Sequence, residues 1–571
     1  MAKILQDHVA QAWDCDPDKP FREPTARATP GPPNVGQCWV MPATGAASGL
    51  QRLSRLVSMI IHPQNRTADQ QQTNMAVMFA QFLAHDISLA AQAPPAEEVT
   101  DLGPGGNPTC LQGPECMPVE VPQNDDFYAQ FNVTRLGMKR THTCNSCGNG
   151  LMLSQDLGGD EYMPDSFSPY ADHCSLPEEN AFCLRAGDSR ANQQPGILSM
   201  QTLWVREHNR IARRLACINP HWEDEELFLV TKRIQEGRYQ HIVYAEWLPW
   251  HLGPAVMEEY DLWVRNTGRT SYDDTLDATL STEFSSAHFR YSHTNVPGAY
   301  WRIDQNGESL AVLKLKDAYF VPLNDTYRPV DNVLRGSVVQ PMEPFSRFGD
   351  HGLTHYLFRQ RGLPYGGDLF ALDIQRARDH GVRPYVDWVQ LCQNISITSF
   401  ADLSQVMPEE TARLYEQVYE DVRDIDLFSG ALSEAPLKGA EVGATFACGV
   451  ASQLRRLKYG DRFYYEHSNQ SGSFSDGFNK PDSAAGALLS LVSHSREPYC
   501  LKSCARVNVG HPRFSLSRRL RSKVLASHTV PARALANIKI ARQPVLMSRR
   551  LETNLTSSDV TTYGRQQKKR F

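Results

Sequence analysis

Length, composition and charge place the chain among ordinary soluble globular proteins: it has 571 residues, of which 41% are hydrophobic and 21% are charged. A chain of this size can bury a large core, as one big domain or as roughly two to four smaller ones. Its formal net charge of −6 gives no reason to expect nucleic acid or an anionic membrane as a partner, and no apolar run is long enough to predict a membrane span.

The N-terminal part of the chain combines an irregular arm with one helix. Residues 1–50 are rich in Pro and Gly and have little periodicity, which predicts an extended arm. Over residues 73–91 the apolar side chains recur at helical spacing, and His85 lies on this apolar stripe. Residues 92–190 hold Pro, Gly and Cys without periodicity, so we expect a loop-rich stretch there.

The middle of the chain is dominated by helical patterns. Pro195 opens the first of them, because proline is favoured at the start of a helix. Strand-like runs are few and short, and no internal repeat is found, so the predicted fold class is mainly α. The expected helices cover residues 195–219, 224–248, 382–393 and 408–422.

The composition changes near the end of the chain. From Ser468 the sequence becomes rich in Ser, Gly and Asn, and its final stretch is basic and weakly patterned. We expect residues 474–571 to form a partly disordered basic tail at the surface rather than a nucleic-acid-binding segment. Residues 51–473 are then expected to form a single domain.

Cysteines and sequons predict an extracellular protein, although the first residues, MAKILQDHVAQAWD, lack the regions of a signal peptide. Six of the 13 cysteines lie close together, which favours a disulfide-stapled region; zinc bound by Cys144, Cys147, Cys110 and Cys116 is the alternative. Six N-glycosylation sequons also favour the secretory route. The clustered cysteines are Cys110, Cys116, Cys144, Cys147, Cys174 and Cys183, and the sequons begin at Asn65, Asn132, Asn324, Asn394, Asn469 and Asn554.

Three short stretches, far apart in the chain, each place a histidine or an arginine where peroxide chemistry at a haem needs one. His85 follows Gln81 by one helical turn, and a base at this position would take a proton from hydrogen peroxide and return it to the departing oxygen. Arg190 would supply positive charge as the O–O bond breaks, and His293 would ligate the iron from the other side. Taken singly, His85 could be a satisfied core histidine and Arg190 an ordinary ion pair. The stretches are QFLAHD at 81–86, GDSRAN at 187–192 and FRYSHT at 289–294.

Together these stretches resemble the animal haem peroxidase family, which includes myeloperoxidase and peroxidasin. The resemblance runs from about residue 15 to about residue 466 and includes WVREHNR at 204–210 and GDRFYYE at 460–466, in the order typical of the family. It implies a mostly helical domain with haem buried at its centre. It also implies the disulfides Cys174–Cys183 and Cys392–Cys448.

Two positions depart from the family in a way that bears on haem attachment. Many members esterify haem through an Asp just before the distal His and a Glu three residues beyond the distal Arg, but here these positions hold Ala84 and Gln193. Gln194 stands where myeloperoxidase has an additional methionine link. We therefore expect haem b to be bound non-covalently, and we do not expect chloride oxidation.

Calcium is the second departure. The resemblance carries Asp86 over as one calcium ligand, but the loop of the form Thr-x-Phe/Tyr-x-Asp-x-Ser that normally supplies the others is absent between residues 132 and 187. Because calcium favours six to eight oxygen ligands, Asp86 alone does not make a site. Either calcium binding is lost, or the chain is a shortened variant.

The stretch LDIQRARDHG at 372–381 supplies the remaining candidates. Arg376, together with Arg290, could hold the haem propionates through charge-assisted pairs. Asp373 stands where relatives commonly have Asn, and a carboxylate that accepts the His293 N–H would make the imidazole more basic. The alternative is that Asp373 pairs with Arg376 or with Arg378.

Two hypotheses of function follow. The leading one is a secreted haem peroxidase that uses hydrogen peroxide to oxidise phenolic donors such as tyrosine, as in the crosslinking of matrix, cuticle or eggshell proteins. The alternative is a catalytically weak peroxidase-like domain used for adhesion or binding, which the departures at Ala84, Gln193 and the calcium loop would favour. A dioxygenase like the cyclooxygenases is disfavoured, because no membrane-inserting helices are found. The sequence predicts no particular oligomeric state.

Overall fold

The computed structural model describes residues 53–65, 72–88, 110–111, 116–141, 183–184, 186, 188–265, 268–321, 330–359 and 362–474. The predicted N-terminal arm and, apart from Phe474, the predicted basic tail lie outside these residues. Within them, no helix is long and apolar enough to cross a membrane.

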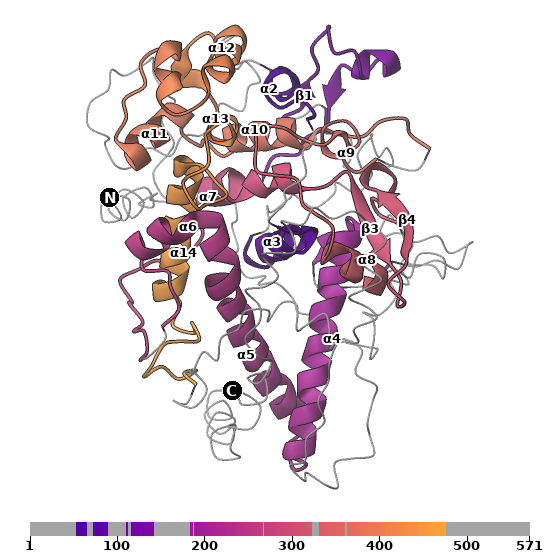
Figure 1. Cartoon of the computed structure of the whole chain (residues 1–571), viewed down its shortest axis with the longest axis vertical. Coiled ribbons are helices and arrows are strands. Elements are labelled where there is room, and N and C mark those ends of the chain that lie inside the picture. The colour runs from indigo at the N-terminus through magenta and orange to yellow at the C-terminus, as the bar shows by residue number, and fades with distance from the viewer. Residues whose placement is uncertain are drawn as a thin grey trace.

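The described chain is mainly α, as predicted (Figure 1). The longer helices are α2 (Ser54–Ile61), α3 (Asn74–Ile87), α4 (Pro195–Ile218), α5 (Asp224–Ile242), α6 (Leu248–Glu259), α8 (Val330–Ser337), α10 (Leu369–Asp379), α11 (Tyr385–Gln393), α12 (Glu409–Val418) and α14 (Ala444–Gly460). Shorter ones are α7 (Thr282–Ser286), α9 (His351–Thr354) and α13 (Leu427–Leu432). The 3-10 segments include η1 (Tyr128–Phe131), η3 (Ser189–Asn192), η5 (His288–Asn295), η6 (Leu315–Asp317), η7 (Phe400–Gln405) and η8 (Val422–Asp424), and η4 (Val243–Trp247) is a π-helical turn.

Strands form two small antiparallel pairs in the described part of the chain. Strand β1 (Val119–Glu120) pairs with β2 (Arg135–Leu136), and β3 (Ala299–Ile303) pairs with β4 (Ser309–Lys314) with an irregularity between Tyr300 and Arg302. These short pairs agree with the few strand-like runs expected from the sequence.

The predicted helix starts are close to those observed, and the ends differ where helices continue into one another. Helix α4 begins at Pro195, and the side chain of Gln194 caps it by accepting a hydrogen bond from the backbone of Gly196. Helix α5 was expected to end near residue 248, but it passes through η4 into α6. Among the longer helices, α2, α6, α8, α10 and α14 were not predicted from the sequence.

Helix α3 occupies the centre of the arrangement. In Figure 1, α4 and α5 diverge upward from a shared lower end, and α3 lies between their upper parts. Helix α3 packs against α4, α8 and η5, so the segment that holds His85 contacts the one that holds His293. One large apolar core cluster surrounds them, with Phe79 of α3, Met200 of α4 and Ile374 of α10 among its fully buried members.

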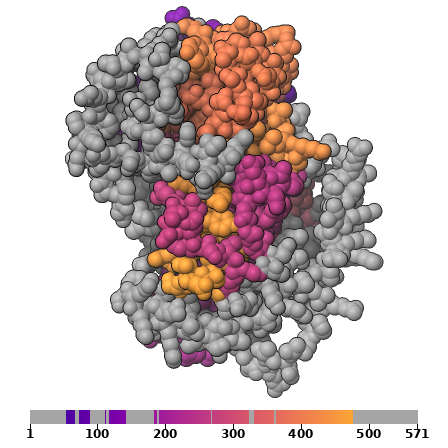
Figure 2. All heavy atoms as spheres, turned by 90° about the vertical axis from the view of Figure 1, so that its left-hand side faces the viewer, coloured from indigo at the N-terminus to yellow at the C-terminus, as the bar shows by residue number. Residues whose placement is uncertain are grey.

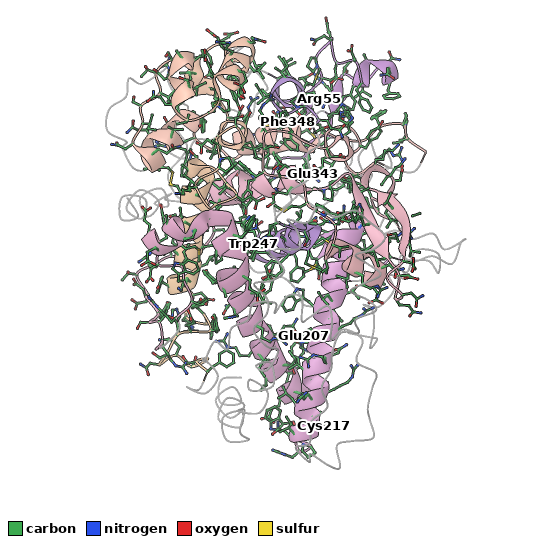
Figure 3. All side chains as sticks on the ribbon, viewed as in Figure 1. Arg55, Glu207, Cys217, Trp247, Glu343 and Phe348 are labelled. Carbon is green, nitrogen blue, oxygen red and sulfur yellow. A yellow bond between two sulfur atoms is a disulfide. The ribbon has the colours of Figure 1, made fainter. Side chains whose placement is uncertain are left out.

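A buried ion network ties the 116–141 segment to this core. Arg55 of α2, only 1% exposed, donates to Asp125 at 2.7 Å and to Asp368 at 2.6 Å (Figure 3). It also donates to the backbone oxygen of Thr354. Because each charge is paired and hydrogen-bonded, removal of one partner would leave an uncompensated buried charge.

Two disulfides lie wholly within the described residues. Cys392–Cys448 joins α11 to α14, and this pairing, implied by the family resemblance, is confirmed. Cys110 is bonded to Cys116, so these two sulfurs are not available to the zinc site considered as an alternative. Cys183 is also disulfide-bonded, but its expected partner Cys174 lies outside the described residues.

Candidate active site

The side chains of His293, Asp373 and Arg290 form one hydrogen-bonded unit. Nδ1 of His293 and Oδ2 of Asp373 are 2.5 Å apart, and Nη1 of Arg290 donates to the other carboxylate oxygen at 2.6 Å. Asp373 is fully buried, whereas the side chain of His293 keeps 29% of its surface exposed. Asp373 therefore contacts His293 and Arg290 rather than Arg376 or Arg378, and the hydrogen bond at Nδ1 leaves Nε2 of His293 as the ring nitrogen available for a ligand.

His85 is buried on the last turn of α3. Burial, followed by the positive charge of Arg190, lowers the pKa of His85 to about 3. The charge of His293 acts in the same direction, which places the two imidazoles within electrostatic range of each other. His85 is thus a neutral imidazole at physiological pH, and its Nδ1 is buried without a hydrogen-bond partner in the described structure.

Arg190 is held at the C-terminal end of α3. Its guanidinium donates to both carboxylate oxygens of Asp188, and to the backbone oxygens of His85 and Ser88, both at 2.9 Å. Carbonyl groups at the end of a helix lack intrahelical donors, so an arginine there satisfies them and fixes the last turn. The ion pair considered in the sequence is therefore present, and it lies beside His85. The anchoring of the helix end by Arg190 was not anticipated.

Gln81 and Gln194 connect α3 to the start of α4. Nε2 of Gln194 donates to Oε1 of Gln81, while Oε1 of Gln194 accepts from the backbone of Gly196 at 2.5 Å. Gln81 is thereby oriented one turn before His85. Gln193 follows η3 at the same junction, and its backbone oxygen accepts from Phe320.

Arg376 lies on α10 and turns toward the 116–141 segment. Its guanidinium donates to Asp379 and to the Thr141 hydroxyl, both at 3.0 Å, and to the backbone oxygen of Lys139 at 2.7 Å. Arg376 interacts electrostatically with Asp373, but its ion pair is with Asp379. The two arginines predicted to hold the propionates therefore have different surroundings. Arg290 is bonded to Asp373 in the His293 unit, and Arg376 is bonded to Thr141, Lys139 and Asp379.

The Asp86 side chain reaches solvent, but many protein atoms lie around its carboxyl group. The desolvation that these atoms cause, and then the negative charge of Glu236, raise the pKa of Asp86 to about 6. Among the described residues, no cluster of three or more His, Cys, Asp or Glu is suited to bind a metal ion. Most of residues 132–187, where relatives have the calcium loop, lies outside the described residues.

The residues present fit a haem. A buried neutral imidazole with an unpaired Nδ1 on α3 lies within electrostatic range of a second imidazole on η5, which is oriented by a buried carboxylate. Histidine ligands of metals are typically oriented in this way by a hydrogen bond from the other ring nitrogen. His293 would hold the iron, and Ala84 and Gln193 have no carboxylate for an ester.

Comparison with known proteins decides the family. The sequence model of the family described as animal haem peroxidase matches residues 40–152 and 145–479. The chain belongs to this family. Membership implies haem binding and hydrogen peroxide as the oxidising substrate.

Several named relatives support the assignment. The Peroxidase of Drosophila melanogaster is 29% identical over 74% of this chain and 67% of its own length. The Chorion peroxidase of Aedes aegypti is 30% identical, with 82% of this chain and 64% of the relative covered. The human Peroxidasin homolog is 30% identical, with 73% and 31% covered, so the chain spans under a third of that relative's length.

Solved structures support the fold. Peroxidase A from Dictyostelium discoideum has a TM-score of 0.61 and 24% identity, with 78% of this chain and 89% of that chain covered. The Oryza sativa fatty acid alpha-dioxygenase has a TM-score of 0.52 and 15% identity, with 77% and 76% covered. The helical architecture is therefore that of the animal haem peroxidase fold.

Proposed function

We propose that this chain is a haem peroxidase that reduces hydrogen peroxide and oxidises phenolic donors in one-electron steps. The observation that carries the proposal is that a neutral, buried His85 on α3 lies within electrostatic range of the His293–Asp373 unit on η5 and α10. Haem, when bound, supplies the redox centre that takes two electrons from the donors. The remaining chemistry belongs to side chains of this protein.

His85 acts as the base and then as the acid. Its low pKa keeps the imidazole unprotonated, so it removes a proton from hydrogen peroxide and returns it to the departing oxygen. Arg190 contributes positive charge near that proton transfer and holds the end of α3, and Gln81 stands one turn away. We assign the reaction with hydrogen peroxide to His85, Arg190 and Gln81.

We assign the binding of haem to four residues: His293, Asp373, Arg290 and Arg376. The buried carboxylate of Asp373 is hydrogen-bonded to Nδ1 of His293, which fixes the ring orientation and favours electron donation to a metal at Nε2. Arg290 donates a hydrogen bond to the other oxygen of the same carboxylate. Arg376 adds positive charge nearby, which favours the anionic propionates of haem. Haem b is bound non-covalently because Ala84 and Gln193 cannot form esters.

We further propose that the protein is secreted and crosslinks extracellular proteins. Relatives named chorion peroxidase and peroxidasin support this setting. Four of the six sequon asparagines, Asn65, Asn132, Asn394 and Asn469, are exposed and accessible for glycosylation. Asn324 and Asn554 lie outside the described residues. Calcium binding through Asp86 would need ligands from outside the described residues.

The test is haem reconstitution followed by turnover. Wild-type protein should develop a Soret band on haem addition and oxidise guaiacol with hydrogen peroxide. His293→Ala should lose the band, whereas His85→Ala should keep the band and lose turnover by about 10²- to 10⁴-fold. Absence of a Soret band in the wild type would overturn the proposal and favour the adhesion or binding domain.

A further inference from the structure

Four tyrosines gather where η4, the end of α14 and the segment after α14 meet. This tyrosine cluster consists of Tyr244, Tyr459, Tyr464 and Tyr465. The ring of Tyr464 lies 5.2 Å from that of Tyr244 and 5.1 Å from that of Tyr465. The Lys458 ammonium contacts two of these rings, lying 5.3 Å from the ring centre of Tyr459 and 5.8 Å from that of Tyr464.

The cluster is connected to the segment that carries the proximal histidine. Tyr244 and Trp247 are three residues apart on the same continuous helical segment, and the Trp247 ring packs 5.9 Å from that of Phe289 in η5 (Figure 3). Phe289 directly precedes Arg290, and His293 follows on the same segment. Electron transfer between aromatic groups weakens steeply with distance. Tyr464, Tyr244 and Trp247 supply oxidisable rings along a route toward η5, and Phe289 supplies the packing contact with that segment.

Three of the four hydroxyl groups have a base as hydrogen-bond partner. Tyr465 is 2.7 Å from Nδ1 of His241, Tyr464 donates to Glu466 at 3.1 Å, and Tyr459 donates to Asp261 at 2.6 Å. A phenol releases its proton when it loses an electron, so an adjacent acceptor makes its oxidation easier. Burial lowers the pKa of His241 to about 4, so this imidazole is neutral and its Nδ1 can accept the Tyr465 hydrogen bond, although the same burial makes it a weaker base.

Tyr239 provides the contrast within the same structure. It packs 5.2 Å from Trp204 and 5.6 Å from Phe82, next to the helix that carries His85. Its hydroxyl is buried, however, and has no hydrogen-bond partner in the described part of the chain. Aromatic packing beside the site therefore does not by itself bring a proton acceptor.

The cluster reaches the surface at Tyr459. This residue is half-buried, and it is bordered by Asp261 and Arg265, whose side chains are 45% and 40% exposed. In Figure 2 the yellow-orange C-terminal part of the described chain lies beside magenta segments from the middle of the chain. The backbone pairing of Asp273 with Tyr459 and of Thr270 with Glu466 holds the two segments together.

We propose that the tyrosine cluster carries oxidising equivalents from the haem site to Tyr459, where phenols too bulky to enter the site, such as tyrosines of other proteins, are oxidised. This inference rests on the proposed function, because its oxidant is hydrogen peroxide acting at haem. The second site lies at the surface, and its substrates are phenols that are part of larger molecules.

Each step balances. Tyr459 loses one electron through Tyr464, Tyr244 and Trp247 to the oxidised haem site, and its hydroxyl proton passes to the Asp261 carboxylate. The neutral Tyr459 radical then takes one electron from the donor phenol and regains its proton from Asp261, while the donor releases its own proton to solvent. Two such cycles reduce one hydrogen peroxide to two waters and leave two phenoxyl radicals, which can couple.

The test compares a small donor with a bulky one in the haem-loaded full chain. Tyr459→Phe and Tyr464→Phe should lower peroxide-dependent dityrosine formation in a glutamate–tyrosine copolymer by at least about tenfold, a barrier increase of about 1.4 kcal/mol. Guaiacol is small enough to reach the haem site directly, so its oxidation should change by less than about twofold in the same variants. Tyr239→Phe is the matched control and should leave the copolymer reaction at the wild-type rate.

A second measurement detects the radical itself, without a donor. Peroxide added in the presence of a spin trap should leave an adduct on Tyr459, located by mass spectrometry, and this adduct should be lost in Tyr464→Phe. Copolymer oxidation that is unchanged in Tyr459→Phe, while guaiacol is oxidised, would overturn the relay alone. A wild-type protein that oxidises neither donor would overturn the proposed function.

Discussion

The carboxylate of Asp373 and the imidazole of His293 are joined by a 2.5 Å hydrogen bond, although they lie 80 residues apart in the chain. The same carboxylate is fully buried and also accepts from Arg290. A buried anion in this position increases the electron donation of the imidazole to any metal bound at its other nitrogen. This relationship leads to the first prediction.

Asp373→Asn should weaken that donation. A neutral amide cannot stabilise positive charge on the ring, so we expect a lower iron–imidazole stretching frequency in the haem-loaded protein and a loss of about tenfold or more in the rate of peroxide reduction. Resonance Raman spectroscopy and stopped-flow kinetics measure the two quantities. Asp379→Asn is the control, because Asp379 pairs with Arg140 and Arg376 rather than with His293. An unchanged frequency in Asp373→Asn would contradict the assignment.

Arg190→Gln should loosen the end of α3. The substitution removes hydrogen bonds to the backbone oxygens of His85 and Ser88, and loss of such partly buried charged hydrogen bonds costs about 1–3 kcal/mol of unfolding free energy. Denaturant unfolding of haem-free protein measures this cost. Arg190→Lys should recover little of it, because an ammonium cannot make the same forked contacts.

The chain contains a matched control for this prediction. Arg423 pairs with Asp421 in the same Asp-x-Arg pattern, also at the start of a 3-10 segment, but its side chain is 68% exposed. Arg423→Gln should therefore leave stability unchanged within error. Equal effects at the two arginines would show that Arg190 acts only as a local ion pair.

Haem should be removable from the wild-type protein by acidified acetone. The ester-forming carboxylates of many relatives are replaced by Ala84 and Gln193, so no covalent bond should hold the pigment. The variant that combines Ala84→Asp with Gln193→Glu should retain part of the haem after peroxide treatment. Pigment that stays with the wild-type protein would refute the non-covalent assignment.

Local patterns predicted five helices, namely α3, α4, α5, α11 and α12, together with the candidate residues, but not the contacts between them. His85 could be placed on an apolar helical stripe, and Pro195 at a helix start, because both follow from neighbours in sequence. Whether Asp373 pairs with His293 or with Arg376 depends on how α10 lies against η5. That packing is set by tertiary contacts, which leave no periodic signal in the sequence.

The features that were not predicted from the sequence also depend on tertiary contacts. Helix α14 mixes small, apolar and basic residues, and it is buried on most sides, so its pattern lacks a clear polar face. The hydrogen bonds from Arg190 to the end of α3 join residues about a hundred positions apart. The proximity of Tyr465 and His241 was also not foreseen, since these residues are 224 positions apart.

Acid should destabilise the protein through its buried histidines, and His288 offers a clean test. Burial lowers the pKa of His288 to about 3 from the ordinary 6.5, and both of its ring nitrogens are without a partner in the described structure. The unfolded chain takes up a proton near pH 6.5 while the folded chain does not. Stability is therefore lost as the pH falls from about 6.5 toward about 3, by about 1.4 kcal/mol per pH unit for each such histidine.

His288→Phe removes one of these protonation sites and keeps an aromatic ring near Trp388, whose ring lies 4.5 Å from that of His288. In denaturant titrations between pH 6.5 and pH 4, we expect its unfolding free energy to fall less steeply than that of the wild type. The difference in slope should be about 1.4 kcal/mol per pH unit, which corresponds to one proton. Above pH 7 neither state binds this proton, so the two proteins should there have parallel pH dependences. Parallel curves at all pH values would mean that His288 becomes protonated in the folded state, which its buried, unpartnered ring opposes.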